Sequence, residues 1–296
     1  MRKYAEFNLK TIMLATDLSP ASYGAMGYVT RLARRFSAKV LLTHVIDPTL
    51  LTTSQKSNLC NTIDCAEKEL QTRLAALEED YIEGRMIVRE GNIRDTILHL
   101  VEERKVDLLV LGTKGQRLKP GTELGSVAEM LLRAVPCPVL TVGPKDRSDA
   151  FDETHPEKIL VTTDFSEASR VILEYAECLA EHFDGHIYLL HVEDKTAVSH
   201  AMSLTEQKGQ FQAFIQSVKT PSRIAEYISC IGSPAERIVK TAAEKNADFL
   251  VMRVHESDQP GGGRLHGIAY DVIRQVKCPV FSLFVPTEGA KIAATT

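Results

Sequence analysis

The stretch TIMLATDLSPAS (residues 11–22) returns later in the chain as KILVTTDFSEAS (residues 158–169). In both stretches an apolar run of strand length meets a Thr-Asp pair, and a serine follows two residues later. Asp17 and Asp164 are in register, which gives a repeat distance of 164 − 17 = 147 residues. Similarity at a fixed distance is the sequence signature of a duplicated structural unit. The sequence therefore predicts two copies of one fold.

The repeat continues over most of the chain. At the same distance His44 of LLTHVID meets His191 of LLHVED. Nearer the end of each copy the distance is 278 − 137 = 141, because Cys137 of PCPVLTV meets Cys278 of KCPVFSL. The difference, 147 − 141 = 6, means that the first copy carries six extra residues somewhere in the range 45–91.

Each copy alternates short apolar strands with amphipathic helices. Strands that are apolar over their whole length are typical of a parallel sheet covered by helices on both faces. The polar, turn-rich segment 143–157 predicts a linker, so we expect domains at 1–147 and 148–296. The predicted fold class is α/β, with two tandem five-stranded parallel doubly wound domains of a Rossmann-like, adenine nucleotide alpha hydrolase-like kind. The strands are expected near 11–15, 40–45, 85–89 and 107–111 and after Pro138, and near 159–162, 187–192, 223–230 and 248–252 and after Pro279.

Composition and net charge limit the classes of binding partner that we expect for this protein. The 296 residues carry 35 basic and 39 acidic side chains, a formal net charge of −4, which argues against nucleic acid or an anionic membrane as the main partner. The apolar runs have strand length rather than membrane-spanning length, so we expect a cytoplasmic protein without membrane insertion. The six cysteines and nine histidines show no ligand spacing, and no metal site is predicted.

The fourth strand of the first copy leads into GTKGQRLKPGTELGSVAEMLL (residues 112–132). Gly112 and Gly115 are separated by two residues, and nine more precede Gly125 and Ser126. Glycines allow backbone amides to approach a phosphate without a Cβ in the way, and a helix amino terminus attracts anions. This spacing predicts a phosphate-binding loop.

Two further features support this interpretation. Ser126 and Glu129 have the spacing of a capping box, which would fix the start of the following helix. Asp17 ends the first strand, and ligands of open α/β sheets bind beyond the carboxyl ends of the strands. Any one of the glycines alone could simply make a turn; the combination favours a nucleotide.

With these residues in view, the chain resembles a tandem universal stress protein, and both halves match. The resemblance rests on TDLS and TDFSEAS, the two HV pairs, the G-x2-G-x9-G-S spacing, SVAE, PCPV and KCPV. The family fold is a five-stranded parallel α/β sheet; many members bind ATP, and others lack the loop and do not. The resemblance implies adenine and ribose contacts from Asp17, Val45 and the Ala15 and Leu111 backbones, and phosphate and ribose contacts from Gly112, Gly115, Gly125, Ser126 and Val127.

The second copy departs from the loop pattern. At the position that corresponds to Gly112, a side chain replaces bare backbone. At the position that corresponds to Gly115, an acidic residue would lie beside phosphate, and a like charge in a low-dielectric cleft costs on the order of a few kcal/mol. We therefore expect one ATP per chain, with or without magnesium, bound by the first copy. At the distance of 141, the residues corresponding to Gly112, Gly115, Gly125 and Ser126 are Arg253, Glu256, His266 and Gly267.

The resemblance favours a stress-response regulatory protein that binds ATP and acts through a protein partner, not identified by the sequence, or through loop conformation. Two alternatives stay open: a nucleotide-independent scaffold, and a slow ATPase or autophosphorylating protein. No residue pattern predicts efficient catalysis, and we name no catalytic residue; His44 and His191 are interpreted as core or loop residues. The apolar last strands, VLTV and VFSLFV, would leave unpaired sheet edges, so we expect the two copies to pair as an intrachain pseudo-dimer, and two chains could pair as a homodimer.

Overall fold

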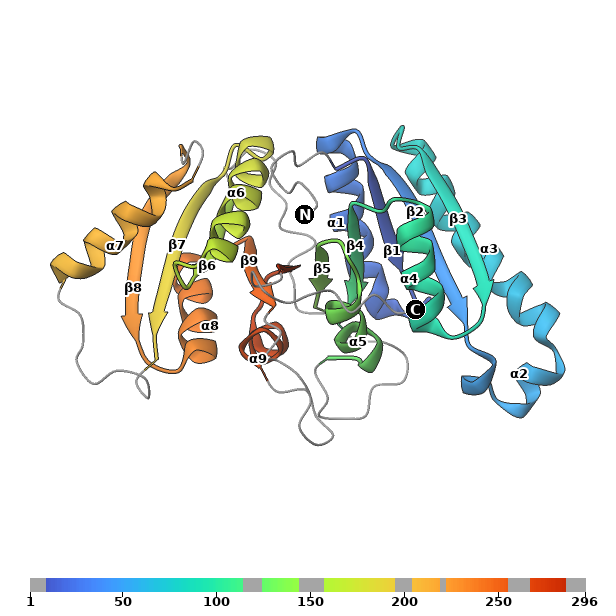
Figure 1. Ribbon diagram of the computed structural model, residues 1–296. Coiled ribbons are helices and arrows are strands. Elements are labelled where there is room, and N and C mark those ends of the chain that lie inside the picture. Colours follow the sequence, from blue (N-terminus) through green and yellow to red (C-terminus); the bar gives the residue numbers. More distant parts are fainter. Residues whose placement is uncertain are drawn as a thin grey trace.

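The computed structural model describes residues 9–113, 124–143, 157–194, 204–218, 222–254 and 267–285. Ten strands form one sheet in the order β3-β2-β1-β4-β5-β10-β9-β6-β7-β8, which runs across the whole molecule (Figure 1). Within each half all neighbouring strands are parallel. The predicted fold class is confirmed.

Each half shows the order of strands and helices that the sequence predicts. The first half contains β1 (Thr11–Ala15), α1 (Pro20–Phe36), β2 (Lys39–Ile46), the 3-10 helix η1 (Pro48–Leu50), α2 (Thr53–Ser57), α3 (Leu59–Glu79), β3 (Gly84–Glu90), α4 (Ile93–Glu103), β4 (Leu108–Gly112), α5 (Ser126–Ala134) and β5 (Val139–Val142). The second half contains β6 (Lys158–Thr163), α6 (Glu167–His182), β7 (His186–Glu193), α7 (Leu204–Gln216), β8 (Ile224–Ile231), α8 (Pro234–Lys245), β9 (Phe249–Val254), α9 (Ile268–Gln275) and β10 (Val280–Phe284).

The two halves join edge to edge through their last strands, as the sequence predicts. β5 and β10 pair antiparallel, with Leu140 opposite Phe281. These two residues are also counterparts in the repeat, since 281 − 140 = 141. The pairing is therefore symmetric about this pair of residues, and a pseudo-two-fold axis passes between them.

Each face of the sheet has one apolar cluster that draws residues from both halves. One cluster lies under α1, α3, α6 and α7 and includes Leu70 of α3 and Phe211 of α7. The other lies under α4, α5, α8 and α9 and includes Ile97 of α4 and Ile238 of α8. Because successive strand residues point to opposite faces, this division tells which side of the sheet each residue of a strand faces.

The burial of α3 and α7 locates the six extra residues. Leu70, Arg73 and Leu77 are buried on α3, and Phe211, Phe214 and Val218 are buried 141 positions later. The shorter repeat distance thus already holds by Leu70, and the extra residues lie between β2 and that point. The first half builds η1 and α2 in this interval; the corresponding residues 195–203 lie outside the described part of the second half.

The aspartate after the first strand shapes the turn into the next helix. The side chain of Asp17 accepts the amide hydrogen of Ser19 at 3.0 Å, and that of Asp164 accepts the amide hydrogen of Ser166 at 3.0 Å. The two serines are the N-cap residues of α1 and α6. In each half the serine therefore caps the helix, and the aspartate orders the turn before it.

A buried ion pair ties the start of the second half to the first. The guanidinium of Arg31 in α1 contacts the carboxylate of Glu157, and the two side chains are 8% and 6% exposed. Glu157 directly precedes β6, and its carbonyl accepts the amide hydrogen of His186 at 2.7 Å. Burial raises the pKa of Glu157, and Arg31 opposes this rise.

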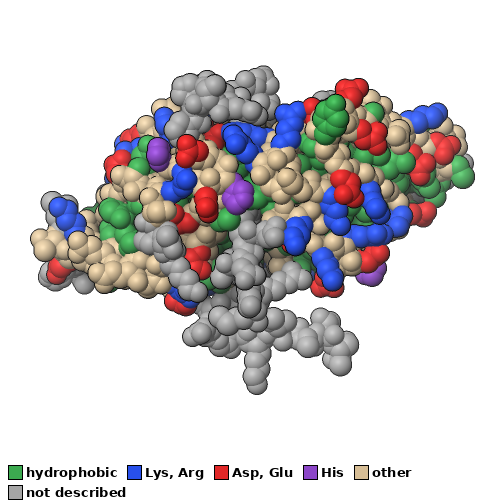
Figure 2. Space-filling view, turned by 90° about the horizontal axis from the view of Figure 1, so that it is seen from above, with side chains coloured by type: hydrophobic (Ala, Val, Ile, Leu, Met, Phe, Trp, Pro, Cys, Tyr) green, Lys and Arg blue, Asp and Glu red, His purple; other side chains and the backbone are tan. Residues whose placement is uncertain are grey.

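The outer strands β2, β3, β7 and β8 point toward the lower edge of the molecule in Figure 1. The view from above shows lysine and arginine side chains interspersed with aspartate and glutamate (Figure 2). Within the described residues, no helix has the length and apolar character needed to cross a membrane.

We predict that Arg31→Met lowers the free energy of unfolding by roughly 3–5 kcal/mol at neutral pH, because removing one partner strands the other in the interior. Without Arg31 the folded-state pKa of Glu157 rises further above its unfolded value. The destabilisation should therefore be smallest at low pH and grow as pH rises through the folded pKa. Urea unfolding at pH 5 and pH 8 measures both effects.

The matched control is Arg34→Met, which breaks the exposed pair with Asp80, whose side chains are 48% and 37% exposed. Exposed pairs contribute about 0–1 kcal/mol. Equal losses in the two variants would contradict a structural role for the buried pair.

Candidate functional site

A cavity of about 670 Å³ opens at the carboxyl ends of β1, β2 and β4, beside the amino end of α5. The strand order changes direction between β1 and β4, and ligands of doubly wound sheets bind at such a switch point. Eight of the nine residues expected to contact ATP line this one cavity. They are Ala15, Asp17, Val45, Leu111, Gly112, Gly125, Ser126 and Val127.

The ninth residue, Gly115, lies outside the described residues.

The strand residues of this group lie on the side of the sheet covered by α4 and α5. Leu111 belongs to the apolar cluster of that side, and Ala15 and Val45 pack against it. Ile93 and Ile97 of α4 complete the apolar wall. An apolar slot therefore lies between the ends of β1, β2 and β4 and the helix α4.

The amino end of α5 forms the polar end of the slot. Gly125 is the N-cap residue, and no side chain caps this helix within the described part of the chain. The backbone places Gly125 by donating its amide hydrogen to the Thr113 carbonyl at 2.8 Å. A Cβ on Gly125 would lie 3.6 Å from that carbonyl oxygen, an ordinary contact. Packing in the described residues therefore does not require glycine at position 125. Because Gly125 has no side chain, the end of the helix stays open to the cavity.

The expected capping box at Ser126 is wrong. The helix begins at Ser126 itself, one residue earlier than the box requires. Glu129 is consequently displaced by one position and does not reach back to the helix start. Its carboxylate instead accepts a hydrogen bond from Arg274 of α9 at 2.7 Å. The spacing of Ser126 and Glu129 is therefore not that of a capping box in the folded chain. Glu129 instead makes a contact between the two halves.

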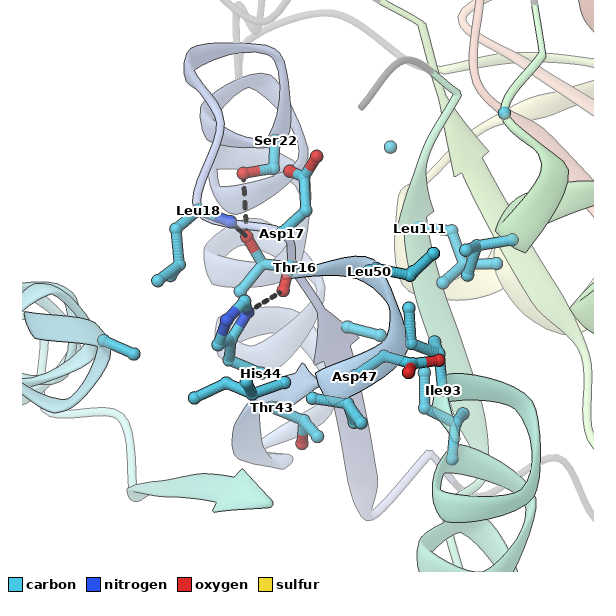
Figure 3. A pocket seen from close by; sticks show the side chains of 18 of the residues that line it. Thr16, Asp17, Leu18, Ser22, Thr43, His44, Asp47, Leu50, Ile93 and Leu111 are labelled. Atoms are coloured by element: carbon cyan, nitrogen blue, oxygen red, sulfur yellow. Dashed lines mark hydrogen bonds between the residues drawn. The ribbon is translucent and has the colours of Figure 1, made fainter. Parts of the chain in front are cut away.

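His44 holds the end of β1 in place. Its Nδ1–H donates to the Thr16 carbonyl at 2.8 Å, and the Thr16 hydroxyl donates to Ser22 at 2.8 Å (Figure 3). Burial lowers the pKa of His44, and Arg73 adds to this, whereas the Thr16 carbonyl and Asp17 raise it. The imidazole is therefore neutral at neutral pH.

Several lining residues were not anticipated from sequence. Ile93 and Ile97 have helical spacing, which indicates only a buried helix face. A further group comes from the segment between η1 and α3, where no motif marks it. Its members are Leu50, Leu51, Gln55, Thr62, Cys65 and Ala66.

The second half fills the corresponding region differently. Arg253, the counterpart of Gly112, is 7% exposed. Its guanidinium donates to the Val285 carbonyl, from Nε at 3.1 Å and from Nη2 at 2.7 Å. Glu256 and His266 lie outside the described residues, and Gly267 is the N-cap residue of α9.

The universal stress protein family model matches residues 8–143 and again residues 156–282. The chain belongs to the universal stress protein family. A universal stress protein of Methanocaldococcus jannaschii is 30% identical over 138 residues, which cover 45% of this chain and 81% of the relative.

Solved universal stress proteins share the tandem fold. One from Archaeoglobus fulgidus has a TM-score of 0.72 and 20% identity over 93% of this chain and 98% of its own. A universal stress protein solved in complex with cAMP is 25% identical over 46% of this chain and 98% of its own, with a TM-score of 0.36.

Metal ligation has no ready site in the part of this universal stress protein that the structure describes, where no three His, Cys, Asp or Glu side chains are grouped to hold an ion.

We predict that His44 titrates below the usual histidine pKa of about 6.5. The unfolded chain then binds a proton that the native protein does not, so stability falls as pH drops through that value. Imidazole NMR shifts measure the titration, and urea unfolding between pH 7.5 and 5.5 measures the slope. In His44→Gln, which keeps an N–H donor, the slope should be shallower; an unchanged slope would contradict the assignment.

Proposed function

We propose that this chain is a stress-response regulatory protein that binds one ATP, in its first half, and acts in the cytoplasm. The supporting observation is the meeting of eight expected contact residues on one cavity at the sheet's switch point. The slot between Val45, Leu111 and the helix α4 suits a flat base.

The uncapped amino end of α5 suits the phosphates. Backbone amides of a first helical turn and the helix dipole together favour an anion. Gly112 and Gly125 bring no side chain to this end of the cavity. Magnesium, if it accompanies ATP, would be held chiefly by the phosphates and by water, as is usual for this ion.

Binding to the second half is not part of the proposal. Arg253 places a buried side chain at the position of Gly112 and uses it to hold the end of the chain segment after β10. A nucleotide there would have to displace these two hydrogen bonds.

Regulation is proposed rather than rapid ATP hydrolysis because the two carboxylates that line the cavity accept hydrogen bonds within turns of the chain. Asp17 accepts the amide hydrogen of Ser19, and Asp47 accepts those of the Thr49 amide and hydroxyl at 2.9 and 2.6 Å. These bonds give both side chains a structural role, and no sequence pattern marks either one as a general base.

The helix α5 offers a route by which occupancy could reach the second half. Its first turn lines the cavity, whereas Glu129 and Arg133 further along contact α9. Arg133 donates to the Tyr270 hydroxyl at 2.6 Å. A shift of α5 on binding phosphate would therefore move contacts that cross the pseudo-two-fold axis.

We predict that ATP raises the melting temperature of the full chain by a few degrees. Ligand at a hundred times its Kd contributes about 2.7 kcal/mol, a shift visible by scanning fluorimetry or calorimetry. The double variant Gly112→Arg, Gly115→Glu copies the second half into the loop and should abolish the shift, because a side chain and a like charge then meet the phosphates.

The matched control is Gly209→Arg on α7, where an added Cβ meets no atom within 4 Å. This variant should keep the full ATP shift. An unshifted melting temperature in the unmodified protein would sink the proposal and favour a nucleotide-independent scaffold.

A further inference from the structure

The cavity extends to the other side of the sheet. Its wall includes Thr62, Cys65 and Ala66 of α3, and α3 packs on the face opposite α4. His44 shares that face, because Leu42, two residues before it, lies in the cluster under α3. We call this part of the cavity the α3 lobe; its residues are Thr16, Leu18, His44, Thr62, Cys65 and Ala66.

The α3 lobe is separate from the residues proposed to hold ATP. Figure 3 shows His44 and Leu18 on one side of the strand ends, and Leu111 and Ile93 on the other. Ala15 and Val45 pack with the cluster under α4 and α5. The proposed nucleotide contacts therefore leave this lobe unused.

The second half shows what fits such a space. Phe165 is the counterpart of Leu18, since 165 − 147 = 18, and both have a φ of 62°. The Phe165 ring lies 4.4 Å from the His191 ring, centroid to centroid. It also contacts the rings of Phe211 at 5.0 Å and Phe214 at 5.6 Å. The lobe's counterpart is thus occupied by an aromatic ring seated on histidine.

The first half has none of these three rings. Leu18 replaces Phe165, Leu70 replaces Phe211 and Arg73 replaces Phe214. His44 nevertheless keeps the geometry of His191, because both imidazoles bind the carbonyl at the end of the first strand, at 2.8 and 2.9 Å. His44 and Leu18 both line the cavity, and the smaller Leu18 side chain stands where a ring covers the histidine of the second half.

The surrounding charges favour a neutral ligand. Arg73 is 5% exposed and donates to the Thr16 hydroxyl at 3.4 Å, beside His44. Its charge is balanced by Glu69, 3.3 Å away, so a cationic ring would add an unbalanced positive charge beside this pair. A cavity of about 150 Å³ holds a benzene ring, and the lobe is one part of a cavity of about 670 Å³.

We propose that the α3 lobe binds an uncharged aromatic ring, seated on the His44 imidazole as Phe165 is seated on His191. The ring belongs to a small molecule or to a substituent of one. The proposal does not depend on ATP, which would occupy the other side of the sheet.

The two exposed cysteines of α3 test this directly. Cys65 lines the lobe, whereas Cys60 on the same helix does not. Indole, the probe, should slow alkylation of Cys65 by iodoacetamide at least threefold and leave Cys60 unchanged, as read by peptide mass spectrometry. Tryptamine, the same ring with a positive charge, should protect at least tenfold less well. Equal effects on both cysteines, or none, would overturn the proposal.

The variant Leu18→Phe supplies the ring covalently, and Phe165 shows that this backbone conformation accepts it. Indole binding, followed by ligand-observed NMR, should weaken at least tenfold in this variant, with an unchanged ATP melting shift. Retained indole binding in Leu18→Phe would refute the lobe as its site. Displacement of indole by ATP would place the ring in the nucleotide slot and refute it as well. A protein that binds indole without binding ATP would contradict only the nucleotide proposal.

Discussion

The antiparallel pairing of β5 with β10 is the constraint on which the rest of the structure depends. Each last strand is short and apolar, and alone would leave an edge open to association. Pairing about Leu140 and Phe281 closes both edges at once. It also merges the cores, because Tyr28 of the first half contacts Phe249 of the second and each apolar cluster spans both halves. The two copies therefore share one sheet and two common cores.

Much of this architecture is local in origin and could be predicted from sequence. Strands buried on both faces are apolar throughout, and the repeat confirms each of them a second time. The pairing of the last strands was predicted as well, but individual side-chain contacts between distant residues could not be predicted. The Ser126 and Glu129 spacing suggested a capping box, but a helix start one residue earlier turned Glu129 toward Arg274, 145 positions away. The sequence also did not predict that residues of α3 line the cavity, because only folding brings α3 close to the ends of the strands.

The duplication separates residues that the fold needs from residues that a ligand could need. Asp17 and Asp164 both order the turn into the following helix, and His44 and His191 both bind the preceding strand's carbonyl. Their presence in both halves is explained by structure, so it is no evidence for a second ligand. The halves differ at Gly112 and its counterpart, and along the lobe beside α3. The differences, rather than the shared residues, point to where the first half has room that the second half has filled.

The same comparison explains why the halves could communicate unequally. Positions 129 and 270 are counterparts, as are 133 and 274, so the two contacts across the axis are one contact repeated. In one direction Arg274 meets a carboxylate; in the other Arg133 meets a tyrosine, with its guanidinium 5.0 Å from the ring centroid. The energy of a partly buried ion pair depends strongly on nearby charge, whereas Arg133 meets the Tyr270 ring and its neutral hydroxyl, which respond less to an added charge. Because Glu129 follows directly on the helix turn that faces the cavity, negative charge bound there would act first on the ion pair. In the proposed complex, the phosphates of ATP would therefore change the Glu129–Arg274 contact more than the Arg133–Tyr270 contact.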